Sequence, residues 1–286
     1  MPYNKPITIG ETPMTVPCGR CIGCRIAHSQ MWALRCTHEI QEHAQNCFLT
    51  LTYSPENIPK HGTLVKKHLQ DFIKRYRKKF VNSHKIRFYA CGEYGEKLSR
   101  PHYHILVFGH QFTDTVKLTS VLNTSEELSK LWKHGFHSIG EANFQTAAYI
   151  ARYVTKKING SQADKHYQAP CLETGELMPI LGEFSTQSLK PGIGANWYEK
   201  YQSDVYPSDE IIHEGRRYPV PAYYDKLLER TNPELFEKVK QNRTDNFEEL
   251  KLQNPNEYNT KRLLEKEKCK QAKITLHLKR EYEKTL

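Results

Sequence analysis

The sequence predicts an α+β protein with a ferredoxin-like, or RRM-like, core. Three observations support this class. Short runs rich in β-branched and aromatic residues recur between residues 47 and 160, amphipathic stretches with helical spacing separate them, and two of the runs follow one another across a short turn. The resulting βαββαβ order is typical of a four-stranded antiparallel sheet with helices on one face.

Each element is expected from its own residues. The first strand ends at Ser54-Pro55, and Gly92 ends the second. Ser125 is expected to begin the second helix, with Glu126 and Glu127 in its first turn. The expected elements, in chain order, are strand 47–53, helix 64–80, strand 86–91, strand 102–108, helix 125–133, strand 136–140 and a further helix 144–157.

Composition excludes several classes of protein. The 286 residues carry 42 Lys and Arg against 32 Asp and Glu, a net charge of +10 that favours a polyanionic partner. An aromatic content of 11% argues against a wholly disordered chain. No apolar run approaches the roughly 20 residues of a membrane span, so we expect no membrane contact. Residues 1–10 have no apolar run either, so we expect no secretory signal and therefore reduced cysteines.

We expect three segments. Residues 1–46 form a Cys- and His-rich segment with a helix, residues 47–160 form the α+β core, and residues 161–286 form an extension that is first turn-rich and then charged and helical. We identify no chemistry in this last segment.

The first segment contains a Cys-x-x-Cys-x-x-Cys motif. Cys18, Cys21 and Cys24 supply three thiolates, one fewer than a tetrahedral structural zinc site requires. Cys36 is the preferred fourth ligand, with Cys47 and His28 as alternatives. The motif therefore predicts a structural Zn²⁺ site, while reduced thiols or an iron–sulfur site remain open.

The strand 102–108 contains His102-Tyr-His104. Side chains alternate along a strand, so the two imidazoles project to the same face and can hold a metal ion together. Glu93 comes back beside His102 if residues 95–101 form a hairpin turn, and Glu96 is an alternative. Two His and a carboxylate with open positions suit Mg²⁺ or Mn²⁺, although Zn²⁺ or Fe²⁺ also fits. The alternative is a pair of ordinary polar histidines without a metal.

The helix 144–157 carries a pair of tyrosines. Tyr149 and Tyr153 are four residues apart and share one helix face, with Arg152, Lys156 and Lys157 nearby. A phenol, whose pKa is near ~10, is a weak nucleophile until a nearby cation favours the phenolate. The spacing suits two nucleophiles that share one metal site, and core packing is the alternative.

The first helix of the core is strongly basic on one face. Its cations are Lys66, Lys67, Lys74, Arg75, Arg77, Lys78 and Lys79. A solvated face would explain them, but with a DNA substrate we expect them, together with Arg152, to contact phosphates.

Together, the His-x-His strand and the Tyr-xxx-Tyr helix resemble the HUH-type (His-hydrophobic-His) rolling-circle replication initiators. The chain is most similar to those of the Microviridae, single-stranded-DNA bacteriophages, and in particular their gokushovirus branch. The motifs that carry the resemblance are Val16-Pro-Cys-Gly-Arg-Cys-Ile-Gly-Cys-Arg25, Phe48-Leu-Thr-Leu-Thr-Tyr53, Gly92-Glu-Tyr-Gly95, Arg100-Pro-His-Tyr-His-Ile105, Tyr149-Ile-Ala-Arg-Tyr153 and Pro191-Gly-Ile-Gly194.

The resemblance implies an HUH endonuclease fold and a metal-dependent nickase that also rejoins strands. His102, His104 and Glu93 match the family's metal ligands, and Tyr149 and Tyr153 match its two nucleophiles. One tyrosine would cleave the origin of the supercoiled replicative form, leaving a 5′-phosphotyrosine and a 3′-OH primer. The second would cleave the regenerated origin, and rejoining would release a single-stranded circle.

The resemblance also implies the setting of this reaction. The partners would be viral origin DNA, duplex and single-stranded, with the host helicase, polymerase and single-strand-binding protein, in the host bacterial cytoplasm. A Lys often follows each family tyrosine by three residues. Here Arg152 follows Tyr149 and Lys156 follows Tyr153, so proton transfer at Tyr149 would need Lys156, Lys157 or water.

Two other functions remain open. A non-enzymatic basic nucleic-acid-binding protein would stack bases on the same sheet and carry a zinc knuckle. A metallohydrolase would attack with water and use the tyrosines only for packing. A covalent protein–DNA adduct distinguishes the first function from both alternatives.

Overall fold

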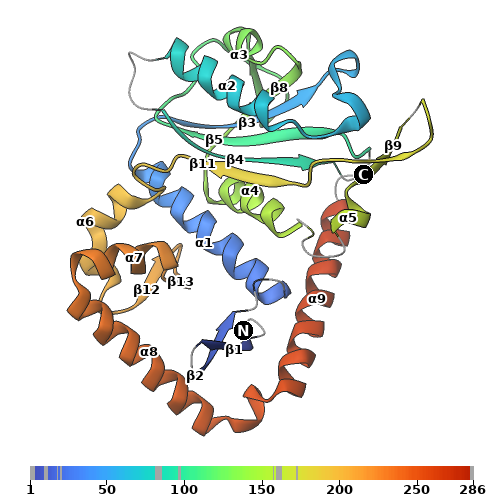
Figure 1. The fold of residues 1–286 in the computed structure, drawn as a ribbon. Helices are drawn as coiled ribbons and strands as arrows, with labels where there is room; N and C mark the ends of the chain where they lie inside the picture. Colours follow the sequence, from blue (N-terminus) through green and yellow to red (C-terminus); the bar gives the residue numbers. More distant parts are fainter. Residues whose placement is uncertain are drawn as a thin grey trace. The chain divides into compact units, whose positions relative to one another are not determined.

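The computed structural model describes residues 4–9, 12–17, 19, 21–80, 86–95, 98–156, 158, 163–171 and 173–283. The described residues form two compact units: residues 32–200, and residues 1–31 with 201–286. Figure 1 shows the elements of each unit. The candidate site lies in the first of them.

Residues 32–200 are built on a seven-stranded antiparallel sheet, ordered β11-β4-β5-β3-β8-β7-β6. The predicted α+β class with an antiparallel sheet is confirmed, but the sheet is larger than the four strands expected. The expected strands are β3 (Asn46–Tyr53), β4 (Arg87–Tyr94), β5 (Pro101–Phe108) and β8 (Gly135–Gly140), and the additional ones are β6 (Thr115–Lys117), β7 (Asn123–Ser125) and β11 (Phe184–Gln187).

The four expected strands interleave as two split βαβ units. β3 and β4 run parallel with β5 between them, and α2 (Lys66–Lys79) connects them. β5 and β8 run parallel with β3 between them, and the connection contains α3 (Glu126–Leu131). As predicted, Ser125 begins α3, because its hydroxyl accepts the Leu128 N–H at 3.1 Å.

Helices cover both faces of this sheet. On one face, Leu49, Tyr103 and Ile105 belong to a buried apolar core that also includes Phe72 of α2 and Trp132 after α3. α4 (Phe144–Lys156) lies across the sheet from α2, on β4 and β5 (Figure 1). This second face is also covered by the part of α1 (Ile22–Gln41) that belongs to the unit, where Trp32 stacks on Tyr89 of β4 at 4.7 Å.

A buried ion pair fastens α1 to this face. Arg87 of β4 donates to Glu39, and the two side chains are 5% and 2% exposed. The second Glu39 oxygen accepts the Gly194 N–H at 2.7 Å. Burial alone would raise the pKa of Glu39, but hydrogen bonds with His43, Gly194 and Arg87, and the Arg87 charge, lower it overall.

Replacing Glu39 with glutamine is expected to cost about 3–5 kcal/mol of unfolding free energy, because Arg87 would stay buried without a countercharge. Since the folded-state pKa of Glu39 is lowered, its contribution is complete above the unfolded-state pKa and is lost as pH falls through the folded value. Urea unfolding at neutral and acidic pH measures both effects. Glu126→Gln, which removes the exposed partner of exposed Lys130, is the control and should cost under about 1 kcal/mol. Equal losses in the two variants would contradict the expectation.

Shorter elements complete residues 32–200. They are the 3₁₀ turns η1 (Pro55–Asn57) and η2 (Lys60–Gly62), helix α5 (Ala163–His166), the hairpin of β9 (Gln168–Pro170) and β10 (Leu177–Pro179), and the first part of α6 (Ala195–Val205). The β9–β10 hairpin precedes β11, which pairs with β4 at one edge of the sheet.

The other unit consists of hairpins and long helices. Arg243 of α8 binds Asp209 and Asp225 at 2.5–2.9 Å and so joins α8 to the segment before it. The charged tail is helical over its described residues, as expected. The elements are β1 (Asn4–Ile9), β2 (Thr12–Pro17), β12 (Glu210–His213), β13 (Arg216–Pro219), α7 (Ala222–Thr231), α8 (Pro233–Gln253), η3 (Pro255–Tyr258) and α9 (Thr260–Glu283). Over the described part of the chain, each helix is too short or too polar to cross a membrane.

Candidate metal centre

Three side chains of the β4–β5 hairpin converge on one point. In the register of the two strands Glu93 lies opposite His102, and His104 follows on the same face. The Nε2 atoms of His102 and His104 lie 2.6 and 2.9 Å from the same oxygen, Oε1 of Glu93. The ligand atoms of the three residues lie within 4.8 Å of one another, so they could hold a metal ion. The sequence predicted that a hairpin would bring Glu93 beside His102, and Glu93 lies there in the β4–β5 register.

The environment of Glu93 also suits a cation. The side chains of Glu93 and His104 are 3% and 5% exposed. Burial by itself would raise the pKa of Glu93, but hydrogen bonds and charge from His102 and His104 lower it, so the carboxylate stays ionised. Its second oxygen, Oε2, is buried and has no hydrogen-bond partner among the described residues. A buried oxygen of this kind is unusual, and a bound cation would satisfy it.

The Nδ1 atoms of His102 and His104 make hydrogen bonds that fix the orientation of the two imidazole rings. The Arg100 carbonyl lies 3.0 Å from Nδ1 of His102, which must donate to it. The Thr50 hydroxyl lies 3.0 Å from Nδ1 of His104. A neutral imidazole has one N–H, so the His102 Nε2 lone pair then faces a carboxylate oxygen. Two acceptors at 2.6 Å require a proton or a cation between them. Donation from the second ring nitrogen to a carbonyl, as at His102, is typical of metal-binding histidines.

Helix α4 brings Tyr149 to this cluster. The Tyr149 ring meets the His104 ring edge-to-face, with centroids 5.2 Å apart and planes at 82°. Phe48 of β3 stacks on His104 at 5.5 Å and also contacts Tyr149 at 6.2 Å, so each of the three rings contacts the other two. Tyr149 is nevertheless 39% exposed, so it is accessible to a substrate from outside.

The other predicted residues of α4 are Arg152, Tyr153 and Lys156. Tyr153 follows Tyr149 by about one helical turn, but its side chain and that of Lys156 lie outside the described residues. Arg152 is exposed on the same helix. Glu96, the alternative ligand, also lies outside the described residues.

The cysteine motif is only partly described. Cys18 lies outside the described residues, and the Cys24 N–H points to Sγ of Cys21 at 3.5 Å. Burial raises the pKa of Cys36, and it raises that of Cys47 to about 12. Where side chains are described, the cluster of Glu93, His102 and His104 is the one group of three possible ligands close enough to share an ion. The zinc site, including its alternative ligand His28, stays a prediction.

The basic residues of α2 do not lie beside Glu93, His102 and His104, because α2 packs on the opposite face of the sheet. Several of them stabilise the fold. Arg75 donates to the Leu131 carbonyl at 3.0 Å, and Arg77 donates to the Ile86 carbonyl and to Ser188. Ion pairs join Lys67 to Asp71 and Lys79 to Glu127, Lys66 lies over the Phe184 ring, and Lys74 and Lys78 are exposed.

Sequence reasoning missed the residues of β3 that support His104. Phe48 and Thr50 lie two residues apart on one face of β3. Their contacts with His104 require the pairing of β3 with β5, in which Thr50 lies directly opposite His104. The run Phe48-Leu-Thr-Leu-Thr-Tyr53 was expected only as a strand. Its alternation of polar and apolar residues was the signal that Thr50 faces away from the core.

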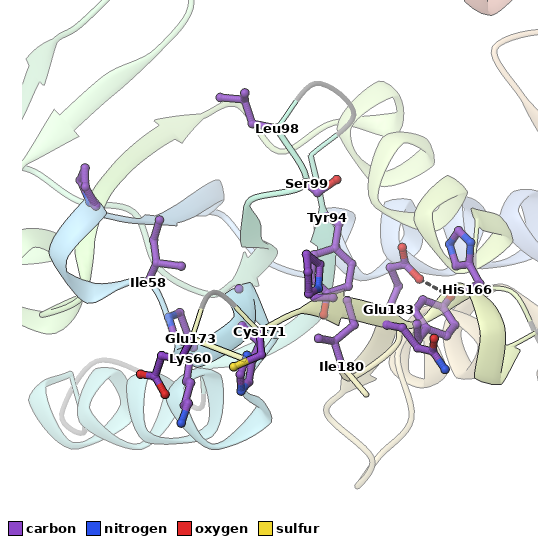
Figure 2. Close-up of a pocket in the computed structure, with 18 residues that line it drawn as sticks. Ile58, Lys60, Tyr94, Leu98, Ser99, His166, Cys171, Glu173, Ile180 and Glu183 are labelled. Atoms are coloured by element: carbon purple, nitrogen blue, oxygen red, sulfur yellow. Dashed lines mark hydrogen bonds between the residues drawn. The ribbon is translucent and has the colours of Figure 1, made fainter. Parts of the chain in front are cut away.

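A separate cavity of about 800 Å³ lies at the end of the β4–β5 hairpin (Figure 2). Lys60, Tyr94 and Cys171 are among its lining residues, and Figure 2 shows that they come from three different segments. None of the three possible metal ligands lines it. Tyr94 follows Glu93 directly, so its side chain points to the other face of the sheet.

The chain is similar to known phage proteins over most of its length. Residues 46–158 match the family model of the replication-associated protein ORF2/G2P. The chain is 33% identical to the replication-associated protein ORF2 of Spiroplasma virus 4, over 79% of this chain and 71% of that protein. It is 32% identical to the replication-associated protein VP4 of Bdellovibrio phage phiMH2K (81% and 73%) and 29% identical to the replication-associated protein ORF4 of Chlamydia phage 1 (75% and 54%). No solved structure matches the chain.

Proposed function

Because the chain belongs to the ORF2/G2P family of phage replication-associated proteins, we propose that it initiates rolling-circle replication by nicking and rejoining viral origin DNA. The observation that carries this proposal is the position of Tyr149, whose ring lies against the His104 ring of a three-residue metal cluster. A phenol at a metal centre suits covalent attack on a phosphodiester.

Tyr149 is the proposed nucleophile of the first cleavage. Its Oη attacks the scissile phosphorus, the bond to the 3′ oxygen breaks, and the 5′ phosphate stays on the tyrosine. The 3′ oxygen takes up a proton and becomes the primer hydroxyl. Tyr153 cleaves the regenerated origin in the same way, and the new 3′-OH attacks the Tyr149 phosphodiester, which closes the circle and restores the phenol. The phosphotyrosine conserves the bond, so joining needs no further energy source.

The residues around Tyr149 orient the reacting groups and supply the positive charge that the reaction needs. Glu93, His102 and His104 would hold Mg²⁺ or Mn²⁺, which when bound polarises the scissile phosphate and contributes several kcal/mol. The packing of Tyr149 against Phe48 and His104 orients its hydroxyl and so reduces the entropy cost of attack. Arg152 stays protonated, so Lys156, Lys157 or water accepts the Tyr149 proton.

The proposed partner is the viral origin, as duplex and then as single strand, with the host helicase, polymerase and single-strand-binding protein acting on the primed template in the bacterial cytoplasm. Exposed Lys74 and Lys78 are the residues of α2 best placed for phosphates, since Arg75 and Arg77 already bond to the fold. Any contact at α2 would be made on the other face of the sheet from the cleavage.

Incubation with a supercoiled plasmid carrying the phage origin tests the proposal. With Mg²⁺ or Mn²⁺ we expect a nicked circle that carries the protein on its 5′ end, seen on a denaturing gel before and after protease. A shifted but intact plasmid would instead support a non-enzymatic binder. Nicks without an adduct would indicate water as the nucleophile, and either result would overturn the proposal.

A further inference from the structure

Phe136 is an exposed aromatic side chain on an internal strand of the sheet. It is 62% exposed; β8 pairs there with Thr52 of β3, while its pairing with β7 is at Ile139. Its neighbour Ile139 on the other face of the strand is 4% exposed. A phenylalanine held largely in water contributes little to the core, and its ring presents an apolar face on which another planar group can pack.

The strand register places Phe136 in one row with the metal cluster. Phe136 lies opposite Thr52 of β3, Thr52 lies opposite His102 of β5, and His102 lies opposite Glu93 of β4. Directly paired residues project to the same face. Phe136 therefore faces the same side as both Glu93 and His102, two strands or roughly 10 Å from His102 at the usual strand spacing, and three strands from Glu93.

The surface between Phe136 and the cluster is polar and partly open. Thr50, Thr52 and Ser138 project to this face, and all three are half-buried. Their hydroxyls can donate to or accept from a sugar or phosphate. Exposed Lys133 precedes the strand, and the chain as a whole has a net charge of +10.

We propose that Phe136 is a stacking platform for an unpaired base of the DNA strand whose scissile phosphate lies at the metal cluster. The identity of that strand rests on the proposed function, whereas the stacking surface rests on the register and exposure of Phe136. The ligand is single-stranded DNA, because the faces of bases in a duplex are already stacked and cannot reach a side chain. The platform would hold the strand open beside the cleavage site.

Anisotropy of a fluorescein-labelled oligothymidine tests this directly. A length of about 16 nucleotides lies within the site sizes of single binding folds. Measurements with the full chain in EDTA keep binding separate from cleavage. We expect Phe136→Ala to weaken single-strand binding about tenfold, because one stacked base is lost, and Phe136→Trp to retain the wild-type affinity.

Two controls test whether the loss of affinity is specific to Phe136 and to single-stranded DNA. Val116→Ala removes another exposed apolar side chain of the same sheet (64% exposed) and should leave the affinity unchanged. A labelled duplex of equal length should bind wild type and Phe136→Ala equally. Wild-type affinity in Phe136→Ala, equal loss for both DNA forms, or no single-strand binding by the wild type would each overturn the platform.

The origin-plasmid assay separates this inference from the proposed function. If no adduct forms and Phe136→Ala still loses single-strand affinity, the nicking function fails and the platform stands. If the adduct forms and Phe136→Ala binds oligothymidine as the wild type does, the platform fails and the nicking function stands.

Discussion

Replacing Glu93 with glutamine is expected to abolish measurable Mn²⁺ binding and to lower the nicking rate by roughly 100-fold or more. Glutamine keeps the size of the side chain but removes the only negative charge of the cluster, so the two imidazoles would face a neutral amide. Isothermal titration with Mn²⁺ measures the first effect, and the origin-plasmid assay measures the second.

A matched variant shows whether the loss of Mn²⁺ binding and nicking is specific to Glu93. Glu126→Gln removes an exposed carboxylate that pairs with Lys130 on α3, and it should leave both Mn²⁺ affinity and nicking unchanged. Thermal unfolding of the two apo variants checks that each is folded. Undiminished Mn²⁺ binding by folded Glu93→Gln would remove this cluster as the metal centre.

Replacing Tyr149 with phenylalanine is expected to reduce the rate of first cleavage by roughly 1,000-fold or more, because the attacking oxygen is lost while the ring contacts with Phe48 and His104 remain. Mn²⁺ affinity should stay at the wild-type value, since no ligand changes. The measurement is the amount of covalent adduct formed in a single turnover on a single-stranded origin oligonucleotide.

Further variants assign the two tyrosines. Tyr201→Phe removes the phenol of a comparably exposed tyrosine (42%) outside α4 and serves as the control. Tyr153→Phe should still form the first adduct but fail to complete a circle. An adduct that persists in Tyr149→Phe and disappears only in the double variant would make the tyrosines interchangeable, and an adduct in the double variant would refute the assignment.

The convergence of Glu93, His102 and His104 was predictable because it depends on local rules. Alternation along a strand placed His102 and His104 together, and a short hairpin returned Glu93 to them. The supporting contacts were not predictable in the same way. Thr50 reaches His104, which lies 54 residues later in the sequence, only through the pairing of β3 with β5.

The size of the sheet and the placement of α2 also could not be predicted from local sequence patterns, because both depend on contacts between residues far apart in the sequence. β11 has only four residues, and it pairs with β4 far earlier in the chain, so no local periodicity marks it as part of the sheet. The positive charge of α2 was evident from the sequence, but the face of the sheet on which α2 packs is decided by the apolar residues on its other side. Contact between the cations of α2 and DNA stays a prediction, and the sequence did not indicate that Arg75 and Arg77 bond to backbone carbonyls of the core.

All three possible ligands come from residues 93–104, a single hairpin, whereas Tyr149 comes from a helix that reaches the sheet much later in the chain. In the proposed mechanism, ion affinity and strand cleavage therefore depend on different parts of the molecule. If this mechanism holds, a chain whose α4 is displaced would still bind the ion but would not cleave DNA, so this architecture allows an ion-bound, inactive form without any change in the ligands.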